Sequence, residues 1–268
     1  MNKALTVAGS DSGGGAGIQA DLKTFAAHGV YGASAITAIT AQNTLGVQAV
    51  ALLDPALVGA QIAAVLGDIG ADAVKTGMLG SSAIIAAAAE QLRRFGVRRL
   101  VVDPVMVAKG GAALLQPEAQ AALCELLLPQ ALLLTPNLPE AACLLGRPIA
   151  TEADMRAAVV DLHRLGPRYV LLKGGHLAGD PLDLLFDGRT ISELPARRIP
   201  TRHTHGTGCT YAAAITALLA RGLGVEEAVP AAHDYIQGAI RHATGIGGGI
   251  GPVHHGWQRE GVRIKDEG

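Results

Sequence analysis

A glycine-flanked turn late in the chain has residue types that could bind an anion and move a proton. It reads Gly206-Thr207-Gly208-Cys209, and residues 211–220 after it are rich in alanine and leucine and contain no proline. This composition favours a helix, so the turn should lie at a helix N-terminus, where backbone N–H groups and the helix dipole attract anions such as phosphate. The same field is expected to lower the pKa of the Cys209 thiol and make it a nucleophile or base. The alternative is an ordinary buried cysteine.

Polar side chains also follow the ends of several strand-like apolar segments. They are Gln42 after 31–40, Asp103 after 99–102, Asn137 and Glu140 after 131–134, and Lys173 after 168–172. Open α/β sheets bind ligands at the carboxyl ends of their strands. Burial of Asp103 is costly unless it is paired or holds a metal, and Lys173 beside two glycines has room to meet a phosphate. Ordinary roles stay open, namely a turn amide for Gln42 and a helix cap for Asn137 with Glu140.

The elements that must position these residues alternate between strand-length and helical segments. This pattern is typical of an α/β fold with a mostly parallel sheet covered on both faces. Strands are expected at 5–8, 31–40, 73–76, 99–103, 131–134 and 168–172, a hairpin at 183–194, and helices at 18–28, 55–67, 82–95, 117–128, 152–165, 211–220 and 225–242. Because no repeat or linker interrupts the pattern, we expect one domain over 1–268 with a polar tail from about 258.

Composition excludes several functional classes. The net charge of −1, from 22 basic and 23 acidic residues, lacks the positive excess that is typical of proteins that bind nucleic acid or an anionic membrane. No apolar run approaches the ~20 residues of a membrane helix. Three widely spaced cysteines form no C-x-x-C pattern, which argues against disulfides and zinc and favours the reducing cytoplasm. The histidines near 203–205 and 254–255 have no partner spacing that would predict a metal site.

The glycine-rich segment 9–17 follows the first expected strand and precedes a helix. It does not fit a P-loop, but Gly15-x-Gly17-x-x-Ala20 fits the short form of a dinucleotide-binding motif. No acidic residue stands about 20 positions later to hold a ribose. A flexible turn is the simpler interpretation.

Seven segments, taken in their order, resemble one known family. They are 8–21 (AGSDSGGGAGIQAD), 38–44 (AITAQNT), 75–79 (KTGML), 103–106 (DPVM), 135–140 (TPNLPE), 172–176 (LKGGH) and 205–210 (HGTGCT). Together they are similar to the hydroxymethylpyrimidine/phosphomethylpyrimidine kinases of thiamine biosynthesis, in the ribokinase-like superfamily. The resemblance covers essentially the whole chain. It implies a ribokinase-like three-layer α/β/α sandwich, a homodimer, and ATP-dependent phosphorylation of 4-amino-5-hydroxymethyl-2-methylpyrimidine to its monophosphate and then to its diphosphate.

The same resemblance implies roles for individual residues. The turn that contains Gly206, Thr207 and Gly208 would form the anion hole for the transferred phosphoryl group and bind the nucleotide, and Cys209 would take the hydroxyl proton where more distant members have aspartate. Lys173 would contact the ATP phosphates. The residues that would organise Mg²⁺ are Asp103, Asn137 and Glu140. Those that would form the pyrimidine pocket are Gly9, Asp21, Gln42, Met78 and Val105, and only the resemblance gives Asp21 a role.

One further expectation concerns Lys109, in the glycine-containing segment 107–114. We expect this segment to act as a mobile lid, so that Lys109 neutralises the phosphate already on the substrate in the second step. A plain surface loop is the alternative. Three rival functions stay open: a vitamin B6 kinase for pyridoxal or pyridoxine, a dinucleotide-dependent oxidoreductase, and a non-catalytic module that senses the pyrimidine.

Overall fold

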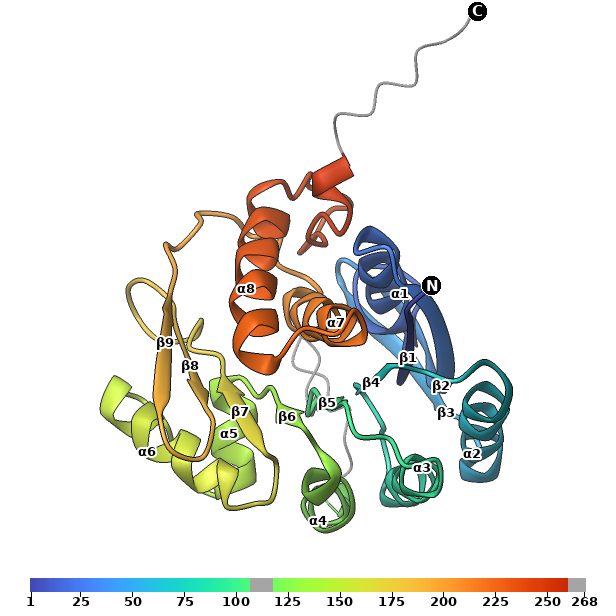
Figure 1. The fold of residues 1–268 in the computed structure, drawn as a ribbon. Helices are drawn as coiled ribbons and strands as arrows, with labels where there is room; N and C mark the ends of the chain where they lie inside the picture. The colour runs from blue at the N-terminus through green and yellow to red at the C-terminus, as the bar shows by residue number, and fades with distance from the viewer. Residues whose placement is uncertain (107–117, 260–268) are drawn as a thin grey trace, which may run out of the picture.

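One central sheet organises the chain (Figure 1). The computed structural model describes residues 1–106 and 118–259, and within them nine strands pair in the order β3-β2-β1-β4-β5-β6-β7-β8-β9. Strands β2 to β7 of this order run parallel, whereas β3 on one edge and β8 and β9 on the other are antiparallel to their neighbours. The bounds are β1 Lys3–Asp11, β2 Tyr31–Asn43, β3 Gly46–Leu52, β4 Ala73–Thr76, β5 Leu100–Val102, β6 Leu133–Leu134, β7 Tyr169–Leu172, β8 Leu182–Phe186 and β9 Ile191–Pro195.

Helices cover both faces of this sheet, which confirms the expected three-layer α/β/α sandwich (Figure 1). One layer holds α1 Gly17–Ala27, α7 Thr207–Ala220 and α8 Val225–Arg241. The other holds α2 Pro55–Ala64, α3 Ser82–Arg94, α4 Ala119–Ala122, α5 Leu138–Leu145 and α6 Glu152–His163. Neighbouring strand residues point to opposite faces, so Leu100 and Val102 join one core while Val101 joins the other. The central strands are therefore mostly apolar, and a polar side chain buried among them needs a partner.

Three elements differ from the sequence-based expectation. The helix expected at 55–67 is α-helical over Pro55–Ala64 and continues as a π-helical turn over Val65–Ile69. Strand β3 was not predicted, because most of its side chains are exposed and it lacks the buried apolar run of the other strands. Of the helix expected at 117–128, the described part is α-helical over Ala119–Ala122. It continues as a π-helical turn over Leu123–Leu127 and a 3₁₀ turn over Leu128–Gln130, where Pro129 supplies no backbone N–H.

The chain reverses its direction across the sheet beside β1. From β1 it passes through α1 to β2 on one side, and after β3 it returns through α2 to β4 on the other side of β1. Such a reversal opens a crevice at the carboxyl ends of the strands, where open α/β sheets bind ligands. The topology therefore places a ligand site at the ends of β1 and β4.

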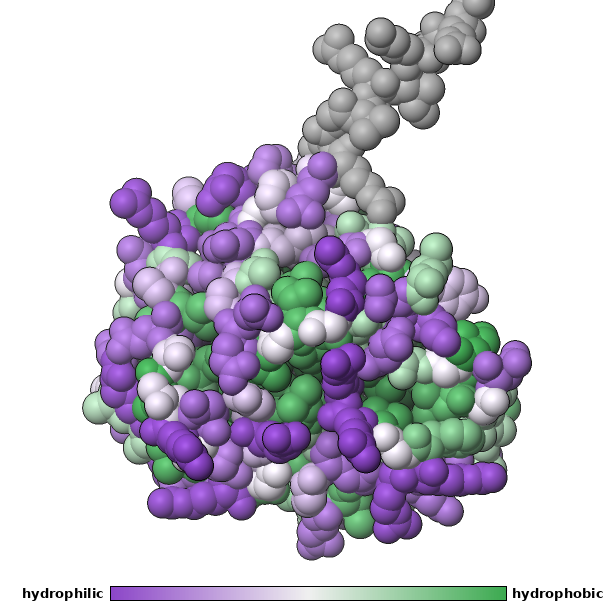
Figure 2. All heavy atoms as spheres, in the orientation of Figure 1, coloured by the Kyte–Doolittle hydropathy of each residue, from purple (hydrophilic) through white to green (hydrophobic). Residues whose placement is uncertain are grey.

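Among the described residues, the helices and the surface pattern give no sign of a membrane span. On the face shown in Figure 2, hydrophobic residues form patches between hydrophilic ones. Helix α7 is buried almost throughout but has only 14 residues. In the described part of the chain, no helix has both the length and the apolarity to cross a bilayer.

A buried ion pair joins β4 to α1 beneath the crevice. Lys75 Nζ donates to Asp21 Oδ2 at 3.0 Å, both side chains are fully buried, and Thr6 Oγ1 of β1 donates to the same oxygen at 2.6 Å. Burial raises the pKa of Asp21, although Lys75 partly offsets this. Burial alone would lower the pKa of Lys75, but the negative charges around it, chiefly that of Asp21, together with the hydrogen bond to Asp21, outweigh burial and raise the value. The two charges therefore hold one another in the core.

Removing one partner of this pair should destabilise the fold strongly. We expect Lys75→Met to lower the free energy of unfolding by about 3–5 kcal/mol, because it leaves the Asp21 carboxylate buried without its cation. Lys75→Met combined with Asp21→Leu should recover most of that loss. The half-exposed Arg147–Asp161 pair, 2.8 Å apart, is the control, and Arg147→Met should cost less than about 1 kcal/mol. Urea unfolding measures all of them, and equal costs for Lys75→Met and Arg147→Met would contradict the account.

Candidate active site

A cavity of about 850 Å³ lies at the carboxyl ends of the parallel strands, next to the N-terminus of α7. It brings together most of the site residues expected from the sequence. They are Gly9, Gln42, Met78, Asp103, Val105, Asn137, Glu140, Lys173, Gly206, Thr207, Gly208 and Cys209. Residues that lie up to 200 positions apart thus share one space, because the carboxyl ends of the parallel strands, the segments that follow them and the N-terminus of α7 meet at the same edge of the sheet.

The first turn of α7 is held in place by a contact that only glycine permits. Gly206 has a φ of 77°, and a Cβ at this position would lie 1.8 Å from the carbonyl oxygen of Gly15. Thr207 Oγ1 donates to Thr204 O at 2.7 Å, and Thr210 N–H donates to Gly206 O. The N–H groups of Gly208 and Cys209 belong to the part of a helix that has no intrahelical acceptor, and these residues line the cavity. The turn therefore suits an anion.

A lysine and a carboxylate lie beside this turn. Lys173 Nζ is 3.0 Å from Asp103 Oδ1, which also accepts a hydrogen bond from Thr135 at 3.1 Å. A Cβ on Gly208 would lie 3.4 Å from Lys173 Nζ and 3.9 Å from Asp103 Oδ2. Burial alone would lower the pKa of Lys173, but the charges of Asp103 and Glu140 outweigh it, so the ammonium is maintained. The ammonium of Lys173 thus lies next to the positive end of helix α7.

Asn137 and Glu140 cap α5 and line the same cavity. Asn137 Oδ1 accepts from Glu140 N–H at 2.9 Å, and Glu140 Oε2 accepts from Asn137 N–H at 2.8 Å. The capping role that the sequence left open is therefore present. Burial raises the pKa of Glu140 to about 7, the charge of Asp103 adds to this, and Lys173 opposes it.

The donor set around Glu140 fits a hard divalent cation. The carboxylates of Asp103 and Glu140 and the amide of Asn137 supply oxygen atoms, the ligands that Mg²⁺ prefers. The raised pKa of Glu140 shows a buried carboxylate that a cation would relieve. Among residues 1–106 and 118–259, no three His, Cys, Asp or Glu side chains are close enough to hold a metal alone. A cation here would therefore keep water or ligand oxygens in its shell.

Cys209 lines the cavity, but the expected lowering of its pKa was wrong. Burial raises the pKa of the thiol to about 11, and the charges of Asp21 and Asp103 add to the increase. The positive charge of Lys75 and a backbone hydrogen bond from Gly17 lower it by less. Desolvation thus dominates, and the group is a thiol near neutral pH.

The residues expected around a pyrimidine ring are brought together in part. Gly9 contacts Met78 closely, since a Cβ on Gly9 would lie 3.0 Å from Met78 Sδ. Gln42 and Val105 line the same cavity. Asp21 instead lies fully buried below it, bound to Lys75, which is itself a lining residue that the sequence did not single out. Lys109 and the segment 107–114 lie outside the described residues, so the lid and the role of Lys109 stay predictions from the sequence.

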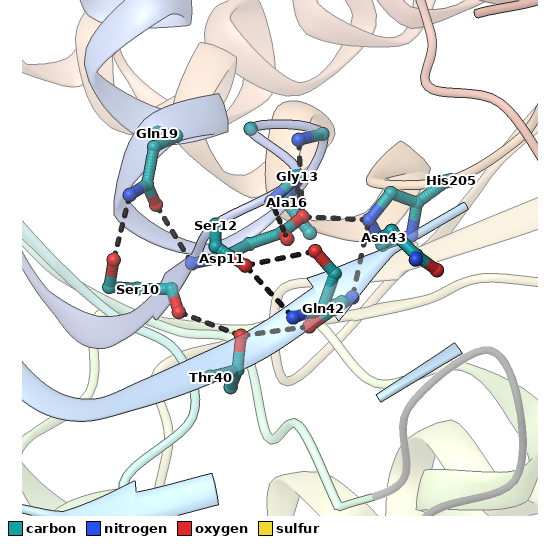
Figure 3. Close-up of polar contacts among 12 residues, drawn as sticks. Ser10, Asp11, Ser12, Gly13, Ala16, Gln19, Thr40, Gln42, Asn43 and His205 are labelled. Carbon is teal, nitrogen blue, oxygen red and sulfur yellow. Dashed lines mark hydrogen bonds and ion pairs between the residues drawn. The ribbon is translucent and has the colours of Figure 1, made fainter. Parts of the chain in front are cut away.

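Asp11 and His205 form a contact that the sequence did not reveal (Figure 3). The Asp11 carboxylate accepts from Gly13 N–H at 2.8 Å, Gly15 N–H at 3.1 Å and Ala16 N–H at 2.8 Å. His205 Nε2 lies 2.8 Å from Asp11 Oδ2. The one available signal was an aspartate directly before a run of small residues, since such a carboxylate can bind several loop N–H groups. Because these N–H groups already donate to Asp11, they hold the loop together and are not available to bind the phosphates of a dinucleotide.

Comparisons with known proteins agree with this geometry. The family model for phosphomethylpyrimidine kinase matches residues 11–254. A hydroxymethylpyrimidine/phosphomethylpyrimidine kinase of Rhizobium meliloti is 59% identical over 256 residues, which cover 94% of this chain and 96% of that protein.

Two solved structures have the same fold. The ADP complex of Bacillus subtilis pyridoxal kinase matches with a TM-score of 0.90 and 43% identity, over 97% of this chain and 99% of that one. A phosphomethylpyrimidine kinase of Clostridium difficile matches with a TM-score of 0.80 and 46% identity, over 90% and 100% of the two chains. These matches confirm the ribokinase-like fold inferred from the sequence motifs. With the family model spanning most of its length, the chain belongs to the phosphomethylpyrimidine kinase family.

Proposed function

We propose that this protein uses ATP to phosphorylate the hydroxymethyl group of 4-amino-5-hydroxymethyl-2-methylpyrimidine, and then the resulting monophosphate, in thiamine biosynthesis. The observation that carries the proposal is the position of Lys173 and Asp103 beside the first turn of α7. This turn shares a cavity with Gln42 and Met78, so an anion site and a site for a small ring are adjacent. Family membership and the ADP complex of the pyridoxal kinase support ATP as the donor.

In the proposed reaction, the chain acts by position and charge. The N–H groups of Gly208 and Cys209 and the ammonium of Lys173 stabilise the negative charge that the transferred phosphoryl group carries. Phosphoryl transfer passes through a loose transition state, so this alignment matters more than a strong base. We propose that Asp103, Glu140 and Asn137 hold Mg²⁺, which would neutralise phosphate charge when bound. The minor thiolate form of Cys209 accepts the proton of the substrate hydroxyl as the new O–P bond forms.

A vitamin B6 kinase is the second candidate, because a pyridoxal kinase shares the fold with a TM-score of 0.90. The higher identity to the hydroxymethylpyrimidine/phosphomethylpyrimidine kinase of Rhizobium meliloti favours the pyrimidine. The oxidoreductase alternative needs loop N–H groups that Asp11 occupies. A purely sensing module would not need Lys173, Glu140 and Cys209 together in the ligand cavity.

We also propose that 1–268 forms one kinase domain, that it acts as a homodimer, and that it works in the cytoplasm. Apolar side chains are exposed near the β3 edge of the sheet, which a second copy could cover. They include Ile39 at 52%, Val50 at 43% and Leu52 at 40% exposure. The free thiols of Cys124, Cys143 and Cys209 suit a reducing compartment.

The proposed activity is tested by incubating the protein with Mg-ATP and the aminopyrimidine alcohol. We expect mass spectrometry to show the monophosphate first and the diphosphate later. Side-by-side rates with pyridoxal should give a kcat/KM that is about 100-fold lower, because a polar contact made to the amino group is lost. A kcat/KM that favours pyridoxal would replace the proposal with vitamin B6 phosphorylation, and no product from either alcohol would overturn both.

The thiol of Cys209 should give the reaction a rising pH dependence. Since its pKa is about 11, the thiolate fraction grows about tenfold per pH unit between pH 7 and 10. We expect single-turnover rates to rise over this range, and Cys209→Ala to lower them about 100-fold and flatten the profile. Cys143→Ala, at an exposed thiol, is the control. A rate for Cys209→Ala that keeps the wild-type profile would show that the thiol takes no proton.

The negative charge of Glu140 should lower the stability of the metal-free protein and favour the binding of a cation. Its folded pKa of about 7 exceeds the ordinary 4.5, so the folded protein binds this proton more tightly and loses stability as pH rises from 4.5 to 7. Glu140→Gln keeps a capping oxygen and removes the charge. Without metal at pH 8, we expect it to raise the free energy of unfolding by about 1–3 kcal/mol, with little gain at pH 4.5.

The same substitution should weaken the use of Mg²⁺. We expect the Mg²⁺ concentration for half-maximal rate to rise at least tenfold in Glu140→Gln, because an anionic ligand is lost. Glu90→Gln, at an exposed position of α3, should change neither property. If Glu140→Gln were less stable at pH 8 and equally sensitive to Mg²⁺, the assignment of Glu140 would be wrong.

A further inference from the structure

Residues from three parts of the chain surround the amide of the Gln42 side chain (Figure 3). His205, just before α7, places Nε2 2.8 Å from Asp11 Oδ2 and 3.4 Å from Gln42 Nε2. On the other side, Thr40 Oγ1 lies 2.9 Å from Ser10 O and 3.2 Å from Gln42 Oε1. The Asp11 and His205 side chains are only 4% and 13% exposed. The Gln42 amide therefore has a fixed partner at each end.

The protons in this network can be assigned from its acceptors. Burial alone would raise the pKa of Asp11, but hydrogen bonds from His205 and from the loop N–H groups outweigh it and lower the value. Asp11 is therefore a carboxylate that can only accept, and His205 Nε2 must carry a hydrogen toward it. The hydroxyl of Thr40 has one hydrogen, and Ser10 O, its nearer partner, can only accept. Thr40 Oγ1 can thus receive a hydrogen bond from Gln42.

These assignments decide which way the Gln42 amide must face. With the Gln42 nitrogen toward His205, the amide N–H groups face the ring N–H, so two donors meet. The Gln42 oxygen then faces the lone pair of Thr40 Oγ1, so two acceptors meet. The two ends of an amide occupy nearly the same space. A rotation of 180° lets Gln42 Nε2 donate to Thr40 Oγ1 and turns Oε1 toward the His205 N–H, whose one hydrogen is then shared between Asp11 at 2.8 Å and Gln42 at 3.4 Å. We propose that the Asp11–His205 pair and Thr40 fix Gln42 with its oxygen toward His205 and its nitrogen toward Thr40, and so set the substrate specificity of the cavity.

The fixed amide would discriminate by the order of donor and acceptor. One lone pair of Oε1 and one N–H of Nε2 stay available, and Gln42 lines the cavity. An aminopyrimidine carries an exocyclic amino group next to a ring nitrogen, which is a matching donor and acceptor. Pyridoxal has no amino group beside its ring nitrogen and cannot use both. This inference rests on the proposed function and assigns His205 and Asp11 as positioning residues for that site.

The test separates an action through Gln42 from a general structural role. His205→Phe keeps a ring against Gly15 but removes the N–H donor, whereas His205→Gln carries a donor to about the same place. We expect His205→Phe to raise KM for the aminopyrimidine alcohol about tenfold, with kcat and KM for ATP within twofold. Its preference over pyridoxal should fall about tenfold. His205→Gln should restore most of the loss.

A double-mutant cycle makes the inference decisive. In a Gln42→Ala background, His205→Phe should change KM for the aminopyrimidine less than twofold, because the group it positions is gone. His163→Phe, at a histidine packed on Phe186, is the matched control and should leave all constants unchanged. Should His205→Phe not fold, Thr40→Val removes the opposite partner of the amide, and it should raise KM severalfold only when Gln42 is present.

The outcomes keep the two proposals apart. An equal rise in KM with and without Gln42, an unchanged KM in His205→Phe, or a failure of His205→Gln to restore it would overturn the positioning role. In each of these cases the wild-type protein would still phosphorylate the pyrimidine. Absence of turnover by the wild-type protein would instead overturn the proposed function, and this inference with it.

Discussion

The contact between Gly206 and the carbonyl oxygen of Gly15 determines where the positive end of α7 lies. A side chain at residue 206 would collide with that oxygen, so glycine allows the turn to pack directly on the loop after β1. Helix α7 is buried almost along its full length, and its first N–H groups are the part that reaches the ligand cavity. Unpartnered N–H groups are costly in an interior, and a bound anion satisfies them. The proposed phosphate site is in this sense a consequence of packing a helix end at the crevice.

Charged groups around that helix end are arranged at a cost in stability. Carboxylates and lysines occur together below and beside the cavity, as the pairs Asp21–Lys75 and Asp103–Lys173 show. Glu140 has no equally close cation, and burial raises its pKa to about 7. Buried charges of this kind are retained where they bind or react, and the cavity is the region where their desolvation can be relieved by phosphate and a divalent cation.

The sequence allowed the layers and the ligand edge to be predicted because both depend on local patterns. Apolar runs marked the central strands, and polar residues at their ends marked the cavity. Strand β3 escaped prediction because its exposed side chains carry no such signal. The pKa of Cys209 was wrongly predicted because a helix terminus is readable from composition, whereas desolvation depends on the packed surroundings. The contact of Asp11 with His205 joins residues 194 positions apart, and no local pattern reveals it.

A crystal structure with ADP, Mg²⁺, aluminium fluoride and the aminopyrimidine alcohol would examine the phosphoryl site directly. The account predicts the fluoride group within about 3 Å of the N–H groups of Gly208 and Cys209 and of Lys173 Nζ. The alcohol oxygen should lie between aluminium and the Cys209 sulfur, with the ring against Gln42. A fluoride group bound elsewhere, with the first turn of α7 facing only water, would contradict the account.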